Sequence, residues 1–508
     1  SLKNKTYLIL FFSIFVFIIE MLGIGVLLPL LKILTDDQFA TSMPNLAKFI
    51  SFFSIYDFKN FDLESEKLFR IKLIIGGCGI IVITFFIKFI FLSYYSFLLL
   101  NYKSQIQSYL SFELLKKYSN VELEYYFNKN SSELVRNITS DVSHFSSTIM
   151  SMIILLVEFF IFIGVFFILI SQQPLNSLFT LLIFSLLIFT MYSLSKKKLL
   201  NYGIKRVEFE GERIKIINQI IEGFKQIKIL GITQNIIKKF YFFNKNSFSL
   251  IAKIGFIGSA QRHFLEFFLV LCLSIIIFLI ILKTKNYNEL IYSIGLFSVA
   301  MFRLFPSFAK ILSNFNNLRA SRFSVVKVFN DLTEIPSENE KITDEKIQFK
   351  GQIAIKQLSF TYKSRPRKIL ENINLEIQKG EMIGFIGESG SGKSTLIELL
   401  MGFLKPSSGK ILIDGKDIFE NLREWRNQIG YVTQKNYLED GTIASNIALG
   451  IPYNEINNQR INICVNEAQL DEFIKTLKDG IETKVGERGI QLSEGQRKRI
   501  EIARALYN

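Results

Sequence analysis

The residues with the clearest chemical role in this chain form one short stretch. It fits the pattern G-x-x-x-x-G-K-[ST] and reads Gly387, Glu388, Ser389, Gly390, Ser391, Gly392, Lys393, Ser394 and Thr395. Glycines at these positions let successive backbone amides turn toward an anion, and a helix that starts here adds the partial positive charge of its N-terminus. Lys393 is expected to reach the outer phosphates of a nucleoside triphosphate, and the Ser394 hydroxyl to bind Mg²⁺. The motif therefore predicts a triphosphate site.

Two flanking elements must position this loop. The apolar run Met382–Ile386 precedes it and predicts a buried strand, and Leu396–Leu400 follows it and predicts a helix. From Ile353 onward, short strands with alternating polarity give way to alternating strand and helix signals, so an α/β domain of the P-loop ATPase type is expected. We place this domain at residues 349–508, after a charged linker at residues 319–348.

The first 318 residues are typical of a membrane domain. The chain of 508 residues contains 51 Phe and has a mean hydropathy of +0.29. Six apolar runs are long enough to cross a bilayer as helices. They are Tyr7–Ile33, Ile71–Leu100, Met150–Ile170, Leu175–Leu194, Phe264–Leu282 and Leu290–Ile311. We therefore expect an α-helical six-span transmembrane domain at residues 1–318.

The distribution of basic residues orients these spans. Residues 195–262 contain fourteen Lys and Arg against four Glu, which places this segment in the cytosol. Six spans put both chain ends on that side, as a cytosolic nucleotide domain requires. Much of the net charge of +15 follows this pattern, so nucleic-acid binding is not expected. Three scattered cysteines and two separate histidines predict neither a disulfide framework nor a zinc site.

Several features of the last third resemble the ATPase domain of ABC transporters. Tyr362 resembles the aromatic residue that stacks on adenine, and Gln434 resembles the Q-loop glutamine that contacts Mg²⁺ and the attacking water. Residues 483–489 resemble the loop that precedes the family's signature. The signature itself is matched by Leu492, Ser493, Glu494, Gly495 and Gln496. The resemblance implies that Tyr362, the P-loop residues and Gln434 bind ATP, and that Ser394 and Gln434 hold Mg²⁺.

One P-loop and one signature per chain imply two half-transporters, and a homodimer is expected. Each signature would present Ser493, a glycine amide and a helix N-terminus to the ATP bound by the other chain. Glu494 departs from the family pattern by bringing a negative charge near that phosphate. The family's Mg²⁺-binding aspartate, catalytic glutamate and switch histidine lie beyond the stretch that ends near Ala505, so no catalytic residue is assigned. We expect the 508-residue chain not to sustain ATP turnover, and robust Lys393-dependent hydrolysis would refute this.

Charged residues inside the spans point to the transported substance, because each is costly in a membrane unless it is paired or faces water. They are Glu20, Lys88, Glu158, Arg262, Glu266, Arg303 and Lys310. Arg303 and Lys310 are seven residues apart and share one helix face. Lys88, Arg262 and Arg303 are predicted to line a cationic substrate cavity. The alternative is structural pairing, in which Arg262 and Glu266 neutralise each other.

The membrane half resembles six-helix exporters, and more narrowly the flippases of lipid-linked oligosaccharides in bacterial protein N-glycosylation. Three stretches carry this narrower resemblance: Ile19–Leu30, Gln261–Glu266 and Ala300–Ser307. It implies that basic cavity residues receive a pyrophosphate-oligosaccharide head while the polyprenyl tail stays in lipid. A short external helix would recognise the lipid, and Leu46–Phe53 lies where that helix is expected.

The exporter resemblance also implies two short coupling helices in the cytosolic loops, near Tyr125–Asn137 and Ile214–Lys228, that press on a nucleotide domain. We therefore expect a multi-pass protein of the bacterial inner membrane that flips a polyprenyl-pyrophosphate-linked oligosaccharide at the expense of ATP. The alternative is a lipid or multidrug exporter of the same fold, whose cavity would be more apolar.

Overall fold

A computed structural model describes residues 2–35, 49–50, 52, 65–127, 129–283, 287–335, 349–364, 367–434 and 436–507. The chain divides into two compact units. The first contains Ser1–Ser119 and Lys129–Ile335, and the second contains Asn120–Asn128 and Pro336–Asn508.

Among the described residues of the first unit, six helices are long and apolar enough to cross a membrane, in agreement with the predicted number of spans. Each helix is longer than its apolar run because polar turns continue it at one or both ends. The six are α1 (Leu2–Thr35), α4 (Ser65–Ser119), α7 (Val142–Gln172), α8 (Pro174–Glu222), α10 (Thr233–Lys283) and α11 (Tyr287–Ala320). The helices α7 and α8 are separated at Gln173, and α8 begins with Pro174 at its first position, where a missing N–H costs nothing.

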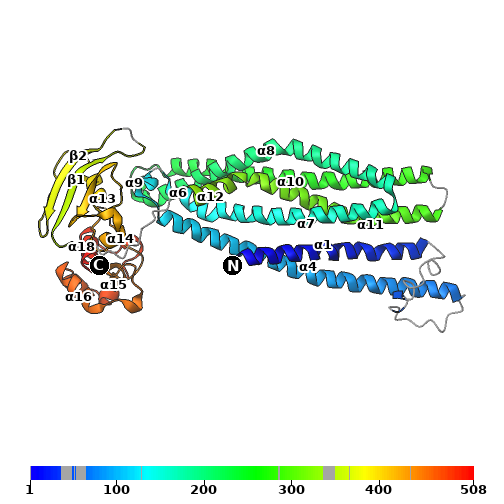
Figure 1. The fold of residues 1–508 in the computed structure, drawn as a ribbon, viewed down its shortest axis with the longest axis horizontal. Helices are drawn as coiled ribbons and strands as arrows, with labels where there is room; N and C mark the ends of the chain where they lie inside the picture. The colour runs from blue at the N-terminus through cyan, green and yellow to red at the C-terminus, as the bar shows by residue number, and fades with distance from the viewer. Residues whose placement is uncertain are drawn as a thin grey trace. The chain divides into compact units, whose positions relative to one another are not determined.

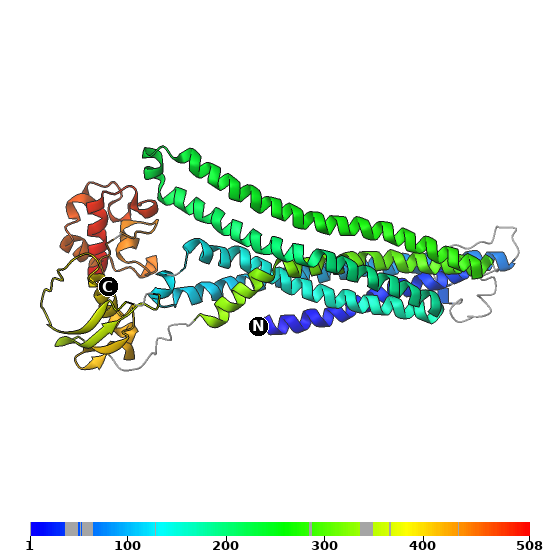
Figure 2. The same cartoon turned by 90° about the horizontal axis from the view of Figure 1, so that it is seen from above.

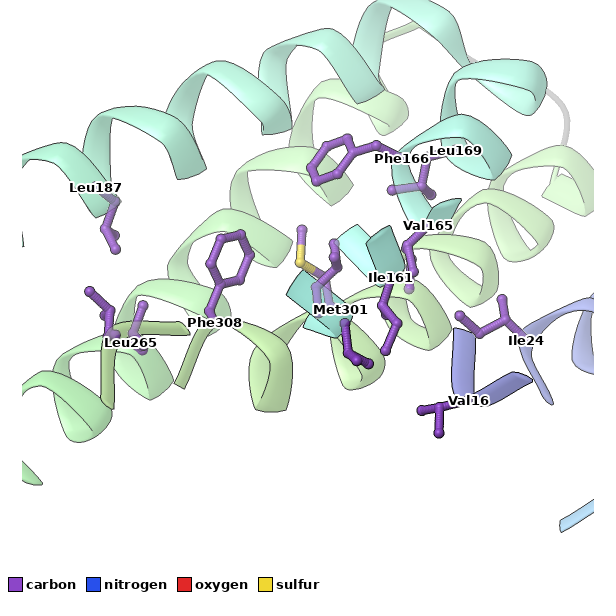
Figure 3. Close-up of a cluster of buried hydrophobic side chains, with 14 of the residues drawn as sticks. Val16, Ile24, Ile161, Val165, Phe166, Leu169, Leu187, Leu265, Met301 and Phe308 are labelled. Carbon is purple, nitrogen blue, oxygen red and sulfur yellow. The ribbon is translucent and has the colours of Figure 1, made fainter. Parts of the chain in front are cut away.

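The long helices run side by side (Figures 1 and 2) and pack in three principal pairs, α1 with α4, α7 with α11, and α8 with α10. Aliphatic and aromatic side chains from these helices fill one core. Figure 3 shows part of this core, where Ile161 and Val165 of α7 lie near Met301 of α11. Many large apolar side chains, such as Phe86 and Phe167, instead face outward. Outward apolar side chains are what a lipid environment requires.

Shorter elements complete the first unit. They are α6 (Ser131–Arg136), a π-helical turn η1 (Asn137–Asp141), α9 (Phe224–Ile229) and α12 (Arg322–Glu334). Asn130 caps α6 by accepting a hydrogen bond from the Ser132 amide. Of the expected external helix Leu46–Phe53, Phe49 and Ile50 are helical, while Leu46 and Phe53 lie outside the described residues.

The second unit contains a four-stranded antiparallel sheet in the order β2-β1-β3-β4. The strands are β1 (Gln352–Phe360), β2 (Leu370–Gln378), β3 (Ser408–Ile413) and β4 (Lys416–Asp417). One face of β1 and β3 packs against α13 (Lys393–Leu400) and α14 (Leu422–Arg426) through a core that includes Leu358, Ile411 and Trp425.

A second cluster of buried apolar side chains joins the remaining principal helices of this unit. These are α15 (Ile443–Ile447), α16 (Asn458–Glu467), α17 (Asp471–Lys475) and α18 (Glu494–Tyr507). A short helix from the loop between α4 and α6 also belongs to the second unit, α5 (Leu123–Phe127), and Leu123 packs against the sheet core. A sheet-containing α/β domain thus accompanies six membrane helices, as expected.

The prediction of a buried strand at Met382–Ile386 is wrong. These residues form no strand, and the side chains of Met382 and Ile386 are 100% and 98% exposed. A strand exists only where a neighbouring segment supplies ladder hydrogen bonds, and none of the described segments pairs with this one. The apolar pattern alone therefore does not determine a strand.

Candidate functional site

The predicted phosphate loop is a tight turn that feeds directly into α13. Gly390 and Gly392 have φ angles of 88° and 93°, in the left-handed region that favours glycine. A Cβ atom on Gly392 would lie 2.9 Å from Leu370 Cδ2, so the close approach of β2 adds a second reason for glycine. Lys393 is the first residue of α13, which confirms the helix expected after the loop. The loop is thus held at a helix N-terminus, where an anion is stabilised.

Lys393 folds back over this loop. Its ammonium donates hydrogen bonds to the carbonyl oxygens of Gly387 at 2.7 Å and Glu388 at 2.8 Å. A cation held at this point is available to a phosphate that enters the loop, because a phosphate oxygen is a stronger acceptor than a backbone carbonyl. Ser394, the predicted Mg²⁺ ligand, is exposed on the first turn of α13, while Thr395 is buried. The exposed Ser389 and Ser391 complete the loop.

The structure brings Tyr362 to the same helix. Its hydroxyl lies 3.1 Å from Thr395 Oγ1, and its ring meets Phe360 edge-on with the ring centroids 4.8 Å apart. Burial raises the pKa of Glu398 on α13, while a hydrogen bond with Tyr362 acts in the opposite direction. Tyr362 is therefore fixed beside the phosphate loop, in a position consistent with the predicted contact to a nucleotide base.

The short helix α5 packs against the segment that carries Tyr362. The buried Glu124 carboxylate accepts a hydrogen bond from the Lys363 amide, and Glu122 forms an ion pair with Lys363 Nζ at 2.9 Å. The hydrogen bond that Lys363 Nζ donates to Glu122 raises the pKa of Lys363. The Phe127 ring meets the Tyr362 ring edge-on, with the centroids 6.1 Å apart. The contact matches the expectation that the loop near Tyr125 presses on a nucleotide domain, but its position next to Tyr362 had no signal in the sequence.

Gln434 is exposed in a loop that α18 anchors. The buried Glu501 of α18 accepts hydrogen bonds from Thr433 Oγ1 at 2.9 Å and from the Tyr437 amide at 2.8 Å. One buried carboxylate thus connects the loop of Gln434 to the helix that starts at the signature. Sequence reasoning missed Glu501, because a glutamate within a helix looks like a surface residue.

The signature residues form the N-terminal cap of α18. The Ser493 amide donates to Gln496 Oε1 at 2.8 Å, and the Gln496 amide donates to Ser493 Oγ at 3.3 Å, which is the reciprocal arrangement of a capping box. Glu494 and Gly495 are exposed, and a Cβ atom on Gly495 would meet open space. This helix N-terminus is therefore accessible to an anion carried by another chain.

Five charged side chains in the spans form one continuous series, which we call the ion chain: Lys88, Glu20, Arg303, Glu158 and Lys310. Lys88 Nζ lies 2.7 Å from Glu20 Oε2, and Arg303 Nε lies 2.9 Å from the same oxygen. Arg303 Nη2 lies 3.8 Å from Glu158 Oε2, and Lys310 Nζ lies 2.7 Å from Glu158 Oε1. Arg303 and Lys310 thus share a carboxylate, as expected of residues on one helix face.

The structure brings Lys88 and Arg303 together but leaves Arg262 out of the ion chain. Arg262 pairs with Glu266 one turn away on α10, with Nε 3.3 Å from Oε1, and its side chain is 65% exposed. The predicted cationic group therefore separates into a buried pair that shares Glu20 and one outlying arginine. The alternative interpretation, local pairing of Arg262 with Glu266, matches this geometry.

An apolar cavity of about 580 Å³ is lined largely by α1, the helix that also carries Glu20 of the ion chain. Residues of α1 between Phe17 and Ile33 form most of its wall, together with Gly77 and Ile80 of α4 and with Phe49 and Ile50. Met21 and Leu22 line the cavity and follow Glu20 directly in α1. Helix α1 thus contributes to both the ion chain and the apolar cavity.

Comparisons with known proteins agree on the type of protein. The family model described as ABC transporter transmembrane region matches residues 6–305, and the model described as ABC transporter matches residues 370–508. An ATP-dependent lipid A-core flippase of Cupriavidus pinatubonensis is 30% identical over 294 residues, which are 58% of this chain and 50% of the flippase. A leukotoxin translocation ATP-binding protein of Mannheimia glucosida is 45% identical over 179 residues, 35% of this chain and 25% of that protein.

The chain thus spans between a quarter and a half of the length of these curated relatives. A solved structure of a bacterial Atm1-family ABC exporter with ATP bound superposes with a TM-score of 0.78 at 17% identity. That superposition covers 100% of this chain and 84% of the exporter chain, and it shows a shared fold.

Proposed function

The chain belongs to the ABC transporter family, and from that premise we propose that it is an ATP-driven half-transporter that flips a polyprenyl-pyrophosphate-linked oligosaccharide across the bacterial inner membrane. Residues 387 and 389–395 with Tyr362 bind ATP in this proposal, and Ser394 with Gln434 holds Mg²⁺. Ser493, Glu494, Gly495 and Gln496 contact the ATP of a second copy. The exposed cap of α18 and the helix N-terminus behind the P-loop support these roles.

The observation that carries the substrate proposal is that α1 contributes both to the ion chain and to the apolar cavity. The ion chain contains three cations and two carboxylates, so it has an excess of one positive charge. The cavity on the same helix has an apolar wall. A ligand with an anionic head joined to a long apolar tail satisfies both, and a pyrophosphate on a polyprenyl chain has this chemistry. Lys88 and Arg303 are the proposed head-group ligands, with Arg262 as a peripheral contact.

A lipid or multidrug exporter of the same fold is the second candidate. The apolar cavity favours it, because a cavity of this kind accepts an acyl chain as readily as a polyprenyl chain. The lipid A-core flippase among the relatives is consistent with a lipid substrate. The two candidates differ in how much the cations of the ion chain contribute to ligand binding.

The test is ligand binding by the protein in nanodiscs, with a labelled polyprenyl-pyrophosphate oligosaccharide compared with a labelled phosphatidylethanolamine. We expect the glycolipid to bind more tightly, and the double variant Lys88→Gln/Arg303→Gln to weaken it by at least about tenfold through loss of charge-assisted hydrogen bonds. Arg262→Gln is the matched control, since it removes the same charge outside the ion chain and should change affinity less than about threefold. Unchanged ATP binding shows that the variants are folded. Equal binding of both lipids, unaffected by the double variant, would establish the general lipid exporter instead.

A further inference from the structure

The two carboxylates of the ion chain are held differently, and this difference indicates a conformational role for Glu20. We propose that the Glu20–Arg303 contact is a latch between two helix pairs, and that a phosphate-bearing head group opens it by taking Arg303 away from Glu20. The inference rests on the proposed function for the nature of the ligand. It adds Glu20, a residue with no role in the predicted site, as the group that sets the affinity for anions.

Glu158 is fully engaged at its place in the ion chain. Its Oε2 accepts a hydrogen bond from the Ser307 hydroxyl at 2.6 Å, and its Oε1 accepts one from Lys310 at 2.7 Å. The side chain is buried, with 3% of its surface exposed. A carboxylate with both oxygens hydrogen-bonded in a buried site is expensive to displace, because its partners would be left unsatisfied.

Glu20 and Arg303 are close without being hydrogen-bonded. Arg303 Nε lies 2.9 Å from Glu20 Oε2, yet within the described part of the chain neither atom has a hydrogen-bond partner, and the same is true of Arg303 Nη2. Only Nη1 of this guanidinium donates a described bond, to Ser307 Oγ at 3.2 Å. Arg303 therefore keeps two unused donors in a buried position. Its contact with Glu20 is an attraction between charges without a hydrogen bond.

The two unused donors match a phosphate better than they match Glu20. Nε and Nη2 lie on one edge of the planar guanidinium, which binds two oxygens of a phosphate at once. A phosphate also carries more negative charge than a carboxylate, and the attraction is stronger in a buried site than in water. The excess positive charge of the ion chain favours the same ligand. An entering phosphate would thus compete with Glu20 and leave Glu158 in place.

Displacement of Glu20 from Arg303 would divide the ion chain at the boundary between two helix pairs, which we call the seam. Glu20 of α1 keeps its contact with Lys88 of α4, and Arg303 of α11 keeps its contacts with Ser307 and, through it, with Glu158 of α7. These are two of the three principal helix pairs of the unit, α1 with α4 and α7 with α11. Within the ion chain, the Glu20–Arg303 contact joins the first pair to the second. Its loss therefore removes an attraction across that seam and favours separation.

The first experiment measures binding of inorganic pyrophosphate to the protein in nanodiscs. Glu20→Gln removes the competing charge, so we expect it to bind pyrophosphate roughly tenfold more tightly than the unmodified protein, as expected for a gain of charge-assisted hydrogen bonds. Glu266→Gln is the matched control, because it removes the same charge from the partner of the exposed Arg262, and its affinity should rise less than about threefold. In Glu20→Gln/Arg303→Gln the gain should vanish. A Glu20→Gln affinity no higher than that of Glu266→Gln would overturn the proposal.

A conservative variant at the same position distinguishes the loss of the Glu20–Arg303 contact from misfolding of the protein. Glu20→Asp keeps the charge that neutralises Lys88 but shortens the reach to Arg303. Its affinity for pyrophosphate is therefore expected to lie between those of the unmodified protein and Glu20→Gln.

A second experiment measures separation of the two helix pairs at the seam. It uses the distance between spin labels at the outward-facing Phe15 of α1 and Phe302 of α11, with the native cysteines replaced. Saturating pyrophosphate should populate longer distances, and an unchanged distribution would refute the latch. If pyrophosphate produces both effects while the glycolipid does not bind, the latch is supported and the proposed substrate is wrong.

Discussion

At the scale of single residues, one exposed carboxylate organises the edge of the nucleotide-domain sheet. Asp414 lies between β3 and β4, and its two oxygens accept hydrogen bonds from the backbone amides of Lys350, Gly351 and Gln352 at 2.6 to 3.2 Å. These bonds, with those from Lys350 and Gln352 acting most strongly, lower the pKa of Asp414 from its ordinary value of 3.8. The charged form is therefore favoured in the folded protein.

The lowered pKa of Asp414 predicts how pH affects the stability of this edge of the sheet. A depressed folded-state pKa contributes stability that is fully present above the ordinary value of 3.8 and is lost as pH falls through the folded-state pKa. Asp414→Asn should therefore increase amide hydrogen exchange at residues 350–352 at neutral pH, and its difference from the unmodified protein should shrink as pH falls below about 3.8. The exposed Asp440→Asn serves as the charge-matched control. A difference between Asp414→Asn and the unmodified protein that persists undiminished at pH 3 would contradict this account.

Individual site residues were predictable to the extent that their role is local. The P-loop needs particular residue types at fixed spacing, so Gly390, Gly392 and Lys393 are visible in the sequence and occur at a helix N-terminus in the structure. The partners of Lys88 and Arg303 were not predictable. Glu20 and Glu158 come from helices far away in the chain, and only tertiary packing brings them to the two cations.

At the scale of elements, the contact between α5 and the segment of Tyr362 has a functional consequence. If Tyr362 stacks on adenine, Phe127 supports the Tyr362 ring through their edge-on contact. Phe127→Ala should then weaken ATP binding by about three- to tenfold, the range expected for one aromatic pair. Binding of inorganic tripolyphosphate, which has no base, should not change. Equilibrium binding of both ligands to the same protein preparation measures the difference.

A neighbouring aromatic residue provides the control for this element. Tyr126 lies next to Phe127 in α5, but its ring meets Tyr125, with the centroids 6.2 Å apart. Tyr126→Ala removes an aromatic ring from the same short helix and should leave ATP affinity within about twofold. Equal losses for ATP and tripolyphosphate in Phe127→Ala would indicate a general disturbance of the domain and not support of the base-binding residue.

Elements were predictable where their stabilising interactions are local. Helix α13 begins at the motif that predicts it, and the break at Gln173 follows from the chemistry of proline. The strand prediction at Met382–Ile386 failed because the ladder of a strand depends on another segment, which periodicity does not reveal. The same limit explains why α5, a five-residue helix, could be placed only approximately.

At the scale of the whole molecule, the six spans and their order with respect to the nucleotide domain follow from composition. Apolar runs that are long enough to cross a bilayer have few alternatives to a helix, since a lipid-exposed backbone must satisfy its hydrogen bonds internally. The exact division of the chain into two compact units was harder to predict from the sequence. Asn120–Asn128 lies between membrane helices in the chain but belongs to the compact unit of the nucleotide domain. Contacts of Leu123 and Glu124 with that domain determine this assignment, and they involve residues more than 200 positions away.

The last prediction concerns pairing of two chains, each with one P-loop and one signature. Lys393→Ala removes the cation that is proposed to contact phosphate, and Gly495→Asp places a negative charge at the exposed cap of α18, where a side chain meets open space. A pair made of one chain of each variant has one site with both defects and one intact site, whereas a pair of identical variants has two defective sites. ATP-dependent energy transfer between dyes at exposed Asn466 should therefore be lost in either variant alone and return to about half in the mixture. The unmodified protein at the same concentration sets the full signal, and a mixture no better than its components would show that the two motifs do not form shared sites.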